Sequence, residues 1–200
     1  MSEDICAFEI NNGPFSKRES VFLESEIARL LLQGYIEICD NKPICVSPIT
    51  CVPKKNGDYR LVTDLRFLNS HCEPPKFKYE DINSVIKITQ PKDYMITADL
   101  KDGFHHIPVH KEHQLLLGFK FKSIYYTWSV LPFGHNCSPY YFTKILRPIV
   151  TYLRSVGLRI VLYVDDFILF ARGDIVNSHK VALLWFLSVT CYVCMYMVFS

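Results

Sequence analysis

The sequence has little excess charge of either sign. Its 22 Lys and Arg residues and 20 Asp and Glu residues leave a formal net charge of only +2 at pH 7. This balance neither requires nor excludes a polyanionic partner, because a nucleic-acid-binding surface depends on the local arrangement of charge. The sequence also lacks repeats and low-complexity segments, and 50% of its 200 residues are hydrophobic. Such a composition argues against a disordered chain and is typical of a folded domain.

The first residues, MSEDICAFEI, are acidic and lack the apolar core of a secretory signal. We therefore expect an intracellular protein, in the cytoplasm or the nucleus, and not a secreted one. In a reducing compartment the eight cysteines are expected to be mostly free thiols and not a disulfide framework.

Two long helical patterns are present. Between Ser20 and Gln33 the apolar residues recur on one helical face, with Ser20 as the expected N-cap and Gly34 as the stop. A second helix is predicted from Ser138 to Val156, and Pro148 inside it is expected to kink it.

Short apolar segments separated by turn residues occupy much of the remaining sequence. They predict a hairpin of 46–52 and 59–62 joined by KKNGD, a short helix at 81–86, a strand at 94–98, and hairpins of 115–121 with 124–128 and of 158–164 with 167–171. This order of helices and short strands predicts an α+β fold with a mainly antiparallel sheet.

The segment IVLYVDDFILF, at 160–170, places two aspartates between apolar flanks. A buried, unpaired charge costs several kcal/mol or more unless it is paired, protonated or bound to a metal. Successive side chains of a straight strand point to opposite faces, so Asp165 and Asp166 can share a site only at a turn. Aspartate also favours turns for structural reasons alone, and this alternative explains the pair equally well.

A third carboxylate favours a metal site. Asp99 ends the apolar strand within MITADLKDGFHHIPV, and three carboxylates at strand ends suit a hard cation such as Mg²⁺. Two such ions about 3.5–4 Å apart activate an attacking hydroxyl and stabilise a leaving oxygen in phosphoryl transfer. The sequence therefore predicts phosphoryl-transfer chemistry at Asp99, Asp165 and Asp166.

Four motifs occur in the order found in reverse transcriptases, and the chain resembles that family from about residue 20 to residue 172. They are YRLVTDLRFLN at 59–69, ADLKDGF at 98–104, LPFG followed by SP within 131–139, and YVDD at 163–166. Each motif alone is weak, but four in order are specific. The stretch SPYYFTKILRPIVTYLRSVGLRIVLYVDDFILFA is most similar to the tyrosine-recombinase (DIRS-like) retroelements.

The resemblance implies an α+β right-hand polymerase with fingers and a palm that has a mainly antiparallel sheet. The thumb of the family is expected to be absent from this sequence, which is a departure from the family pattern. Residues 1–19 would form an N-terminal segment, 20–92 mainly the fingers, and 93–180 mainly the palm with fingers-side insertions. Residues 181–200 would be an atypical apolar tail.

The implied activity is that of an RNA-directed DNA polymerase, which adds deoxynucleotides to a primer 3′-hydroxyl. Its partners would be an RNA or DNA template with its primer and deoxynucleoside triphosphates. Its cofactor would be two Mg²⁺ ions, with Mn²⁺ as an alternative. Asp99, Asp165 and the Leu100 carbonyl would bind the metals, and Asp166 would complete the acidic cluster.

The resemblance also implies contacts with the incoming nucleotide. Arg60 and Lys55, or its neighbour Lys54, would reach the triphosphate, because a forked guanidinium and a flexible ammonium both suit phosphate oxygens. The backbone amides of Asp102 and Gly103 would also face the triphosphate.

Three further residues would shape the nucleotide pocket. Phe104 would lie under the sugar, where a bulky ring excludes a 2′-hydroxyl and makes the product DNA. An ordinary core aromatic is the alternative for Phe104. Phe133 would line the pocket, and Gly134 would allow a close backbone turn.

The final twenty residues, VALLWFLSVTCYVCMYMVFS, contain no charge and depart from the family, which has a lysine-bearing loop and a primer grip there. They are the frameshifted or misannotated end of a decayed element, a helix that still packs, or a membrane span. The alternatives for the whole chain are accordingly a truncated, catalytically inactive retroelement fragment that binds nucleic acid weakly at most, or a tail-anchored relic. The oligomeric state is not predicted.

Overall fold

The computed structural model describes residues 7–55, 57–100, 102–164 and 166–172, and they divide into two compact units. The first consists of the described parts of Met1–Pro74 and Ile107–Ser138, and the second of those of Pro75–His106 and Pro139–Ser200. The chain therefore passes back and forth between the units. The sequence-based division into fingers, palm and flanking segments remains a prediction.

A five-stranded sheet with the order β1-β3-β7-β8-β2 forms the first unit's framework. Its strands are β1 (Phe8–Glu9), β2 (Ile36–Cys39), β3 (Cys45–Ser47), β7 (Gly118–Phe121) and β8 (Ile124–Trp128). The predicted hairpin in this region is confirmed as β7–β8. Strand β7 begins later than expected because residues 115–117 form a turn after the short helix α4 (Lys111–Gln114). The pairs β1–β3 and β3–β7 are parallel.

Helix α1 (Lys17–Leu32) begins one turn earlier than the sequence predicts. Its N-cap is Ser16 and not Ser20: the Ser16 hydroxyl accepts from the Glu19 amide at 3.3 Å, and the Glu19 carboxylate accepts from the Ser16 amide at 2.8 Å. This reciprocal capping box satisfies two amides that lack partners in the first turn. The helix ends at the predicted place, where Gly34 adopts φ 69°.

The core of the first unit lies between α1 and the five-stranded sheet. Of the apolar residues that the helical pattern places on one face of α1, Leu23, Ile27 and Leu30 are buried. They share a cluster with aromatic residues of β7 and β8, where Phe119 stacks on Tyr126 at 5.2 Å between ring centroids. The capped helix is therefore anchored to the sheet along one apolar face.

Ser16→Ala is expected to lower the free energy of unfolding by about 0.5–2 kcal/mol, because it removes the oxygen that caps α1. The matched control is Ser20→Ala, within the helix, for which we expect less than about 0.5 kcal/mol. Urea unfolding followed by circular dichroism measures both. A larger loss for Ser20→Ala than for Ser16→Ala would contradict the observed cap.

A separate two-stranded hairpin, also in the first unit, confirms the predicted pairing around KKNGD. Strand β4 (Ile49–Pro53) pairs antiparallel with β5 (Tyr59–Thr63), and the Lys54 amide donates to the Asp58 carbonyl at 2.7 Å across the connection. The short helix α2 (Arg66–Ser70) follows β5.

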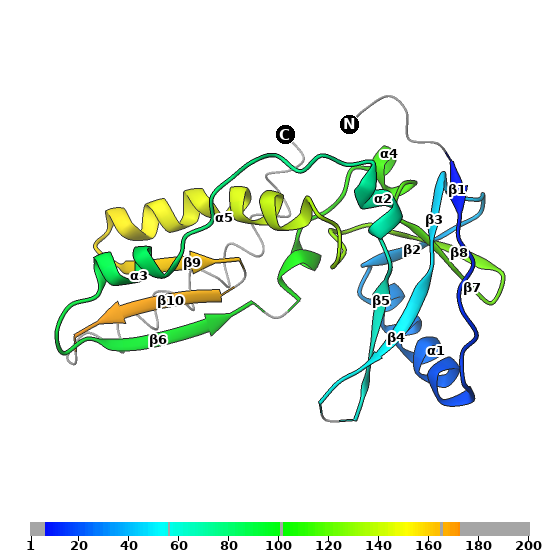
Figure 1. The fold of residues 1–200 in the computed structure, drawn as a ribbon, viewed down its shortest axis with the longest axis horizontal. Coiled ribbons are helices and arrows are strands. Elements are labelled where there is room, and N and C mark those ends of the chain that lie inside the picture. The colour runs from blue at the N-terminus through cyan, green and yellow to red at the C-terminus, as the bar shows by residue number, and fades with distance from the viewer. Residues whose placement is uncertain (1–6, 56, 101, 165, 173–200) are drawn as a thin grey trace. The chain divides into compact units, whose positions relative to one another are not determined.

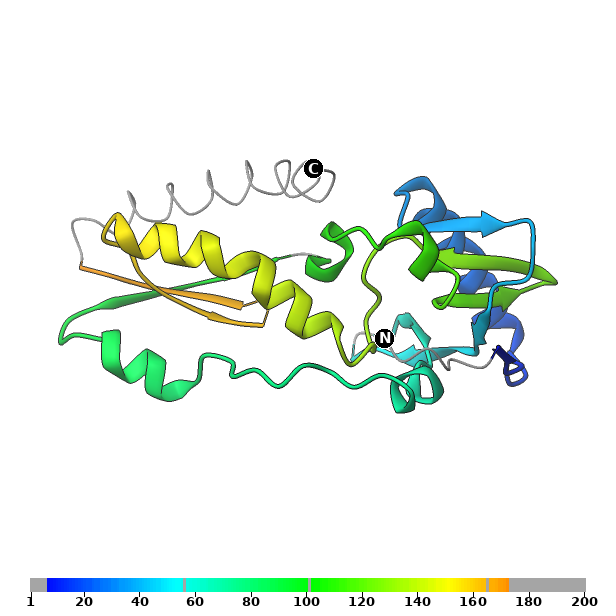
Figure 2. The ribbon, with the colours of Figure 1, turned by 90° about the horizontal axis from the view of Figure 1, so that it is seen from above.

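The second unit contains an antiparallel sheet with the order β6-β10-β9. Its elements are β6 (Tyr94–Asp99), β9 (Arg159–Tyr163), β10 (Asp166–Ala171), the 3₁₀ turn η1 (Gly103–His106), α3 (Ile82–Ile88) and α5 (Ser138–Ser155). Helix α5 runs alongside the three strands in both views (Figures 1 and 2). The predicted cap of α3 by Asp81 is confirmed.

Helix α5 nearly matches its predicted range. Pro148 lies inside it as expected, and Gly157, at φ 92°, follows its end. Phe142, Leu146, Val150 and Leu153 recur at helical spacing and are buried. No helix in the described part of the chain is both long and apolar enough to cross a membrane. The predicted apolar tail, 181–200, lies outside the described residues.

Candidate active site

Two of the three predicted acidic positions meet at one end of the β6-β10-β9 sheet. Asp99 is the last residue of β6, Asp166 is the first residue of β10, and they stand directly opposite each other in the antiparallel ladder. Opposed positions in such a ladder have Cβ atoms about 4.5–5.5 Å apart and share a face. The fold thus places two carboxylate-bearing positions, 67 residues apart in sequence (166 − 99), side by side.

The connection between β9 and β10 is tight. Tyr163 pairs with Asp166, so two residues join the strands, and Val164 has φ 57°. Hairpins of this length require a positive φ, which is unfavourable for a β-branched residue. Such a conformation costs on the order of 1–3 kcal/mol and persists only where its surroundings fix it. Asp165 lies outside the described residues, and Asp166 begins a strand instead of standing at the hairpin tip as predicted.

The turn after β6 carries further predicted site residues. The Gly103 amide donates to the Leu100 carbonyl at 3.0 Å. The carbonyl keeps a second lone pair for a metal, whereas the amide already has a partner in this conformation. Asp102 has φ 55°, which aspartate tolerates better than most residues.

Packing explains the glycine in this turn. A Cβ on Gly103 would lie 3.1 Å from Cζ of Phe142 on α5, which is closer than a normal contact. Gly103 itself has no positive φ among the described backbone angles. The Phe142 ring is therefore a sufficient reason for a glycine here, whether or not its amide faces a triphosphate as predicted.

Phe104 is almost fully buried, with 7% of its surface exposed. Its ring meets that of Phe142 edge to face, at 5.1 Å between centroids and 72° between planes. This arrangement fits the core-aromatic alternative that the sequence left open. Phe142 belongs to no motif, and only the helical spacing of α5 could have indicated its importance.

The predicted triphosphate-binding cations lie on the β4–β5 hairpin of the first unit. Lys54, Lys55 and Arg60 are all exposed. The hairpin is held to α1, where the Arg18 guanidinium donates to the Gly57 carbonyl at 3.3 Å and lies 5.4 Å from the centre of the Tyr59 ring. The structure therefore presents three cations on a hairpin that a helix supports.

The LPFG loop, residues 131–134, also belongs to the first unit. Phe133 is 47% exposed, and Gly134 has φ 89°. Asn69 holds the loop at two points: its side-chain amide donates to the Gly134 carbonyl at 2.8 Å, and its side-chain oxygen accepts from the Asn136 amide at 2.9 Å. Burial lowers the pKa of the adjacent His135, which favours its neutral form. The sequence motifs contain Asn69 but did not indicate this positioning function.

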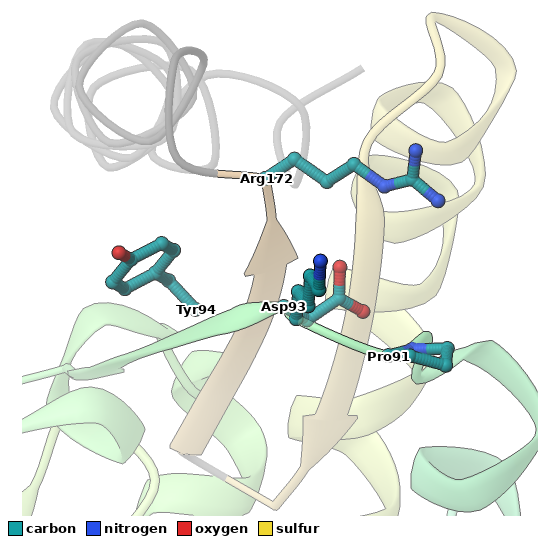
Figure 3. Close-up of a pocket in the computed structure, with 5 residues that line it drawn as sticks. Pro91, Asp93, Tyr94 and Arg172 are labelled. Atoms are coloured by element: carbon teal, nitrogen blue, oxygen red, sulfur yellow. The ribbon is translucent and has the colours of Figure 1, made fainter.

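A pocket of about 670 Å³ lies at the opposite end of the β6-β10-β9 sheet. Its lining residues are Pro91, Lys92, Asp93, Tyr94 and Arg172 (Figure 3). Asp93 forms a two-bonded ion pair with Arg159, with both oxygens 2.6 Å from guanidinium nitrogens, and these hydrogen bonds hold the pKa of Asp93 below its usual range. The charge of the Asp93 carboxylate is already compensated by Arg159, and Asp93 lies at the other end of β6 from Asp99. The pocket is therefore not the predicted metal site.

Among the residues whose side chains the structure describes, no three His, Cys, Asp or Glu residues are arranged to hold a metal ion. The predicted metal set requires Asp165 and the side chain of Asp99, and both are outside this described set. The opposed positions of Asp99 and Asp166 are therefore the structural observation that bears on this site.

Comparison with known proteins places the chain among retroelement proteins. The family described as reverse transcriptase (RNA-dependent DNA polymerase) matches residues 52–188. The chain is 29% identical to the Gag-Pol polyprotein of Walleye dermal sarcoma virus over 88% of its own length and 10% of the polyprotein. It is 26% identical to a Tf2-3 transposon polyprotein of Schizosaccharomyces pombe, covering 87% of the chain and 13% of the polyprotein.

Solved structures share the fold. The chain resembles the prototype foamy virus protease-reverse transcriptase with a TM-score of 0.73 and 25% identity, over 91% of this chain and 24% of that one. It also matches the foamy viral protease-reverse transcriptase in complex with an RNA/DNA hybrid, at a TM-score of 0.73 and 22% identity, over 98% and 25% of the two chains. The expected α+β fold with a mostly antiparallel sheet is thus confirmed. The chain spans a quarter or less of the curated relatives it matches.

Proposed function

The chain belongs to the reverse transcriptase (RNA-dependent DNA polymerase) family, and we propose that it adds deoxynucleotides to the 3′-hydroxyl of a primer paired with an RNA or DNA template. Members of this family are RNA-directed DNA polymerases and use divalent metal ions. The observation that carries the proposal is the direct opposition of Asp99 and Asp166 across β6 and β10. The comparisons favour this activity over an inactive fragment or a membrane-anchored relic.

The acidic positions fit a pair of Mg²⁺ ions. Two carboxylates at opposed positions of an antiparallel pair repel each other, and oxygen donors of this type are those that Mg²⁺ prefers. We assign the metal-binding function to Asp99, Asp165, Asp166 and the Leu100 carbonyl, with Mn²⁺ as an alternative ion. When bound, the two metals would stabilise negative charge on the attacking and leaving oxygens.

The protein's own groups would position the reactants around these acids. The backbone ladder between β6 and β10 fixes the positions of Asp99 and Asp166 at the acidic end of the sheet. The tight β9–β10 connection limits how far Asp166 can move, since Tyr163 pairs with it directly. Positioning of this kind supplies much of the rate enhancement in phosphoryl transfer.

Each unit, considered by itself, contains residues that the resemblance assigns to nucleotide binding. In the first unit, the exposed Arg60 and Lys55, or Lys54, would bind the triphosphate, and Phe133 and Gly134 would line the nucleotide pocket. In the second unit, the Asp102 and Gly103 amides would face the triphosphate, and Phe104 would lie under the sugar. For the Gly103 amide this requires release from the Leu100 carbonyl, to which it donates at 3.0 Å.

The narrower lineage is also a proposal. We assign the chain to the tyrosine-recombinase (DIRS-like) retroelements because of the stretch from SPYYFTKIL through YVDDFILFA, now seen to form α5, β9 and β10. A retroelement enzyme of this kind would act in the cytoplasm or the nucleus. A reading frame for a tyrosine recombinase in the same genetic element would support the lineage, and an integrase frame in its place would contradict it.

Incubation of the full chain with a DNA primer on an RNA template tests the activity. We expect extension with deoxynucleoside triphosphates and Mg²⁺, and none when the metal is chelated with EDTA. Extension that persists with EDTA would exclude a metal-dependent mechanism. Failure to extend any primer over a wide range of protein concentration, with Mg²⁺ or Mn²⁺, would overturn the proposed activity for this chain.

A further inference from the structure

Strand β9 lies at an edge of the sheet that carries the acidic positions, as far as the described residues go. Its order is β6-β10-β9, so within the described part of the chain β9 has a strand neighbour on one side only. An edge strand leaves every second amide and carbonyl without a partner, and proteins usually cover or satisfy such groups. The groups at this edge matter for the site because β9 ends at Tyr163, and only two residues then precede Asp166.

Two side chains from distant parts of the chain bind the outer edge of β9. A Glu80 carboxylate oxygen accepts from the Leu162 amide at 2.8 Å. The Arg154 guanidinium of α5 donates to the Ile160 carbonyl at 3.0 Å from Nε and 2.6 Å from Nη2. The two bound groups are two residues apart on β9, as are the outward-facing groups of an antiparallel strand.

The same two side chains also bind each other. Arg154 Nη2 lies 2.7 and 2.8 Å from the two Glu80 oxygens, and both side chains are partly buried, with 29% of Glu80 and 41% of Arg154 exposed. Charge-assisted hydrogen bonds of this kind are stronger than neutral ones. Glu80 and Arg154 thus act as one ion pair, which supplies the acceptor and donor that a fourth strand would otherwise provide.

The Glu80–Arg154 ion pair contacts β9 next to the strained part of the β9–β10 hairpin. Leu162 immediately precedes Tyr163, whose ring lies 6.3 Å from that of Tyr79. Tyr79 and Glu80 are adjacent, so one short segment contacts β9 at both residues. The next residue, Val164, has a left-handed backbone that needs such support to persist.

We propose that Glu80, fixed by Arg154, is a positioning residue that holds β9 so that the acidic end of the sheet keeps its catalytic geometry. It binds neither metal nor nucleotide and acts only through Leu162 and the strand. The inference rests on the proposed polymerase function for its kinetic consequence, but its structural part, protection of the Leu162 amide, does not depend on activity.

Hydrogen exchange tests the structural part. Glu80→Ala is expected to raise the exchange rate of the Leu162 amide at least about tenfold, because a loss of 1.4 kcal/mol in protection corresponds to that factor. Amides bonded between β6 and β10 should keep their rates. Glu80→Gln keeps an oxygen that can accept from Leu162, so it should retain most of the protection. The control is Glu24→Ala, which removes a surface carboxylate paired only with Lys122 among the ion pairs of the described chain.

Primer extension tests the kinetic part. Glu80→Ala is expected to lower kcat about tenfold or more with little change in the KM for deoxynucleotide, with partial recovery in Glu80→Gln and no effect in Glu24→Ala. Unchanged Leu162 exchange in Glu80→Ala, or faster exchange throughout the sheet, would overturn the proposal. So would altered exchange at Leu162 with unaltered kcat. A wild-type chain without activity would contradict the proposed function instead, and the exchange result alone would then decide whether Glu80 fixes β9.

Discussion

Asp166→Asn is expected to lower the rate of Mg²⁺-dependent primer extension by about two to three orders of magnitude, and Asp165→Asn at least as much. Each substitution removes a negative charge from the acidic end of the sheet, where charge on the reacting oxygens must be stabilised through bound metals, and the loss of one such electrostatic contribution typically has this effect. Single-turnover extension on a fixed primer–template measures it. Retention of more than about a tenth of the wild-type rate would exclude a metal-binding function for the substituted residue.

Stability should change in the opposite direction. Because Asp166 stands opposite Asp99, the metal-free chain carries like charges at facing positions, and like charges there are destabilising. Asp166→Asn is therefore expected to leave unfolding in EDTA unchanged or to stabilise the fold by about 0.2–1 kcal/mol. Lost activity with a lower stability would indicate that the carboxylate supports the fold and not the chemistry.

Asp81→Asn is the matched control. It removes a carboxylate from the same unit, but at the N-cap of α3, where asparagine caps about as well as aspartate. We expect neither the rate nor the stability to change appreciably. A comparable loss of activity in this variant would show that the assay responds to the charge of the whole unit.

Local patterns predicted the elements that depend on nearby residues. The β4–β5 and β9–β10 hairpins, the Asp81 cap and the α5 helix all form from short-range signals, and the structure has them within a few residues. The start of α1 was wrong because Ser16 and Ser20 are both suitable caps, and the turn between them has few apolar residues to mark the helix. The parallel contacts of β3 with β1 and β7 join distant segments, which no local pattern specifies.

The acidic positions were predictable for a similar reason, since each ends or begins an apolar strand. Their alignment was not, because the register of Asp99 with Asp166 depends on a pairing between strands far apart in sequence. The supporting residues were missed altogether. Glu80 binds a strand that lies 82 residues later, and Asn69 binds a loop 65 residues later. Side chains of this kind look like ordinary polar residues until the fold brings their partners close.

Phe104→Ala is the second prediction with a large effect. Phe104 is buried against Phe142, so its removal is expected to lower the free energy of unfolding by about 3–5 kcal/mol. If the ring also lies under the sugar of the incoming nucleotide, the variant should in addition accept ribonucleotides more readily, because the group that would clash with a 2′-hydroxyl is gone. Urea unfolding and competition between ribo- and deoxynucleoside triphosphates in primer extension measure the two effects.

Phe142→Ala separates packing from sugar discrimination. It removes the other half of the same ring contact, so its effect on stability should be similar, but Phe142 is not part of the motif that faces the nucleotide. If only Phe104→Ala relaxes discrimination, the ring acts on the sugar directly. Equal relaxation in both variants would mean that discrimination depends on how firmly the turn after β6 is packed, since Gly103 also lies against Phe142. Unchanged discrimination in a folded Phe104→Ala variant would leave Phe104 as a core residue, for which its burial is already a sufficient reason.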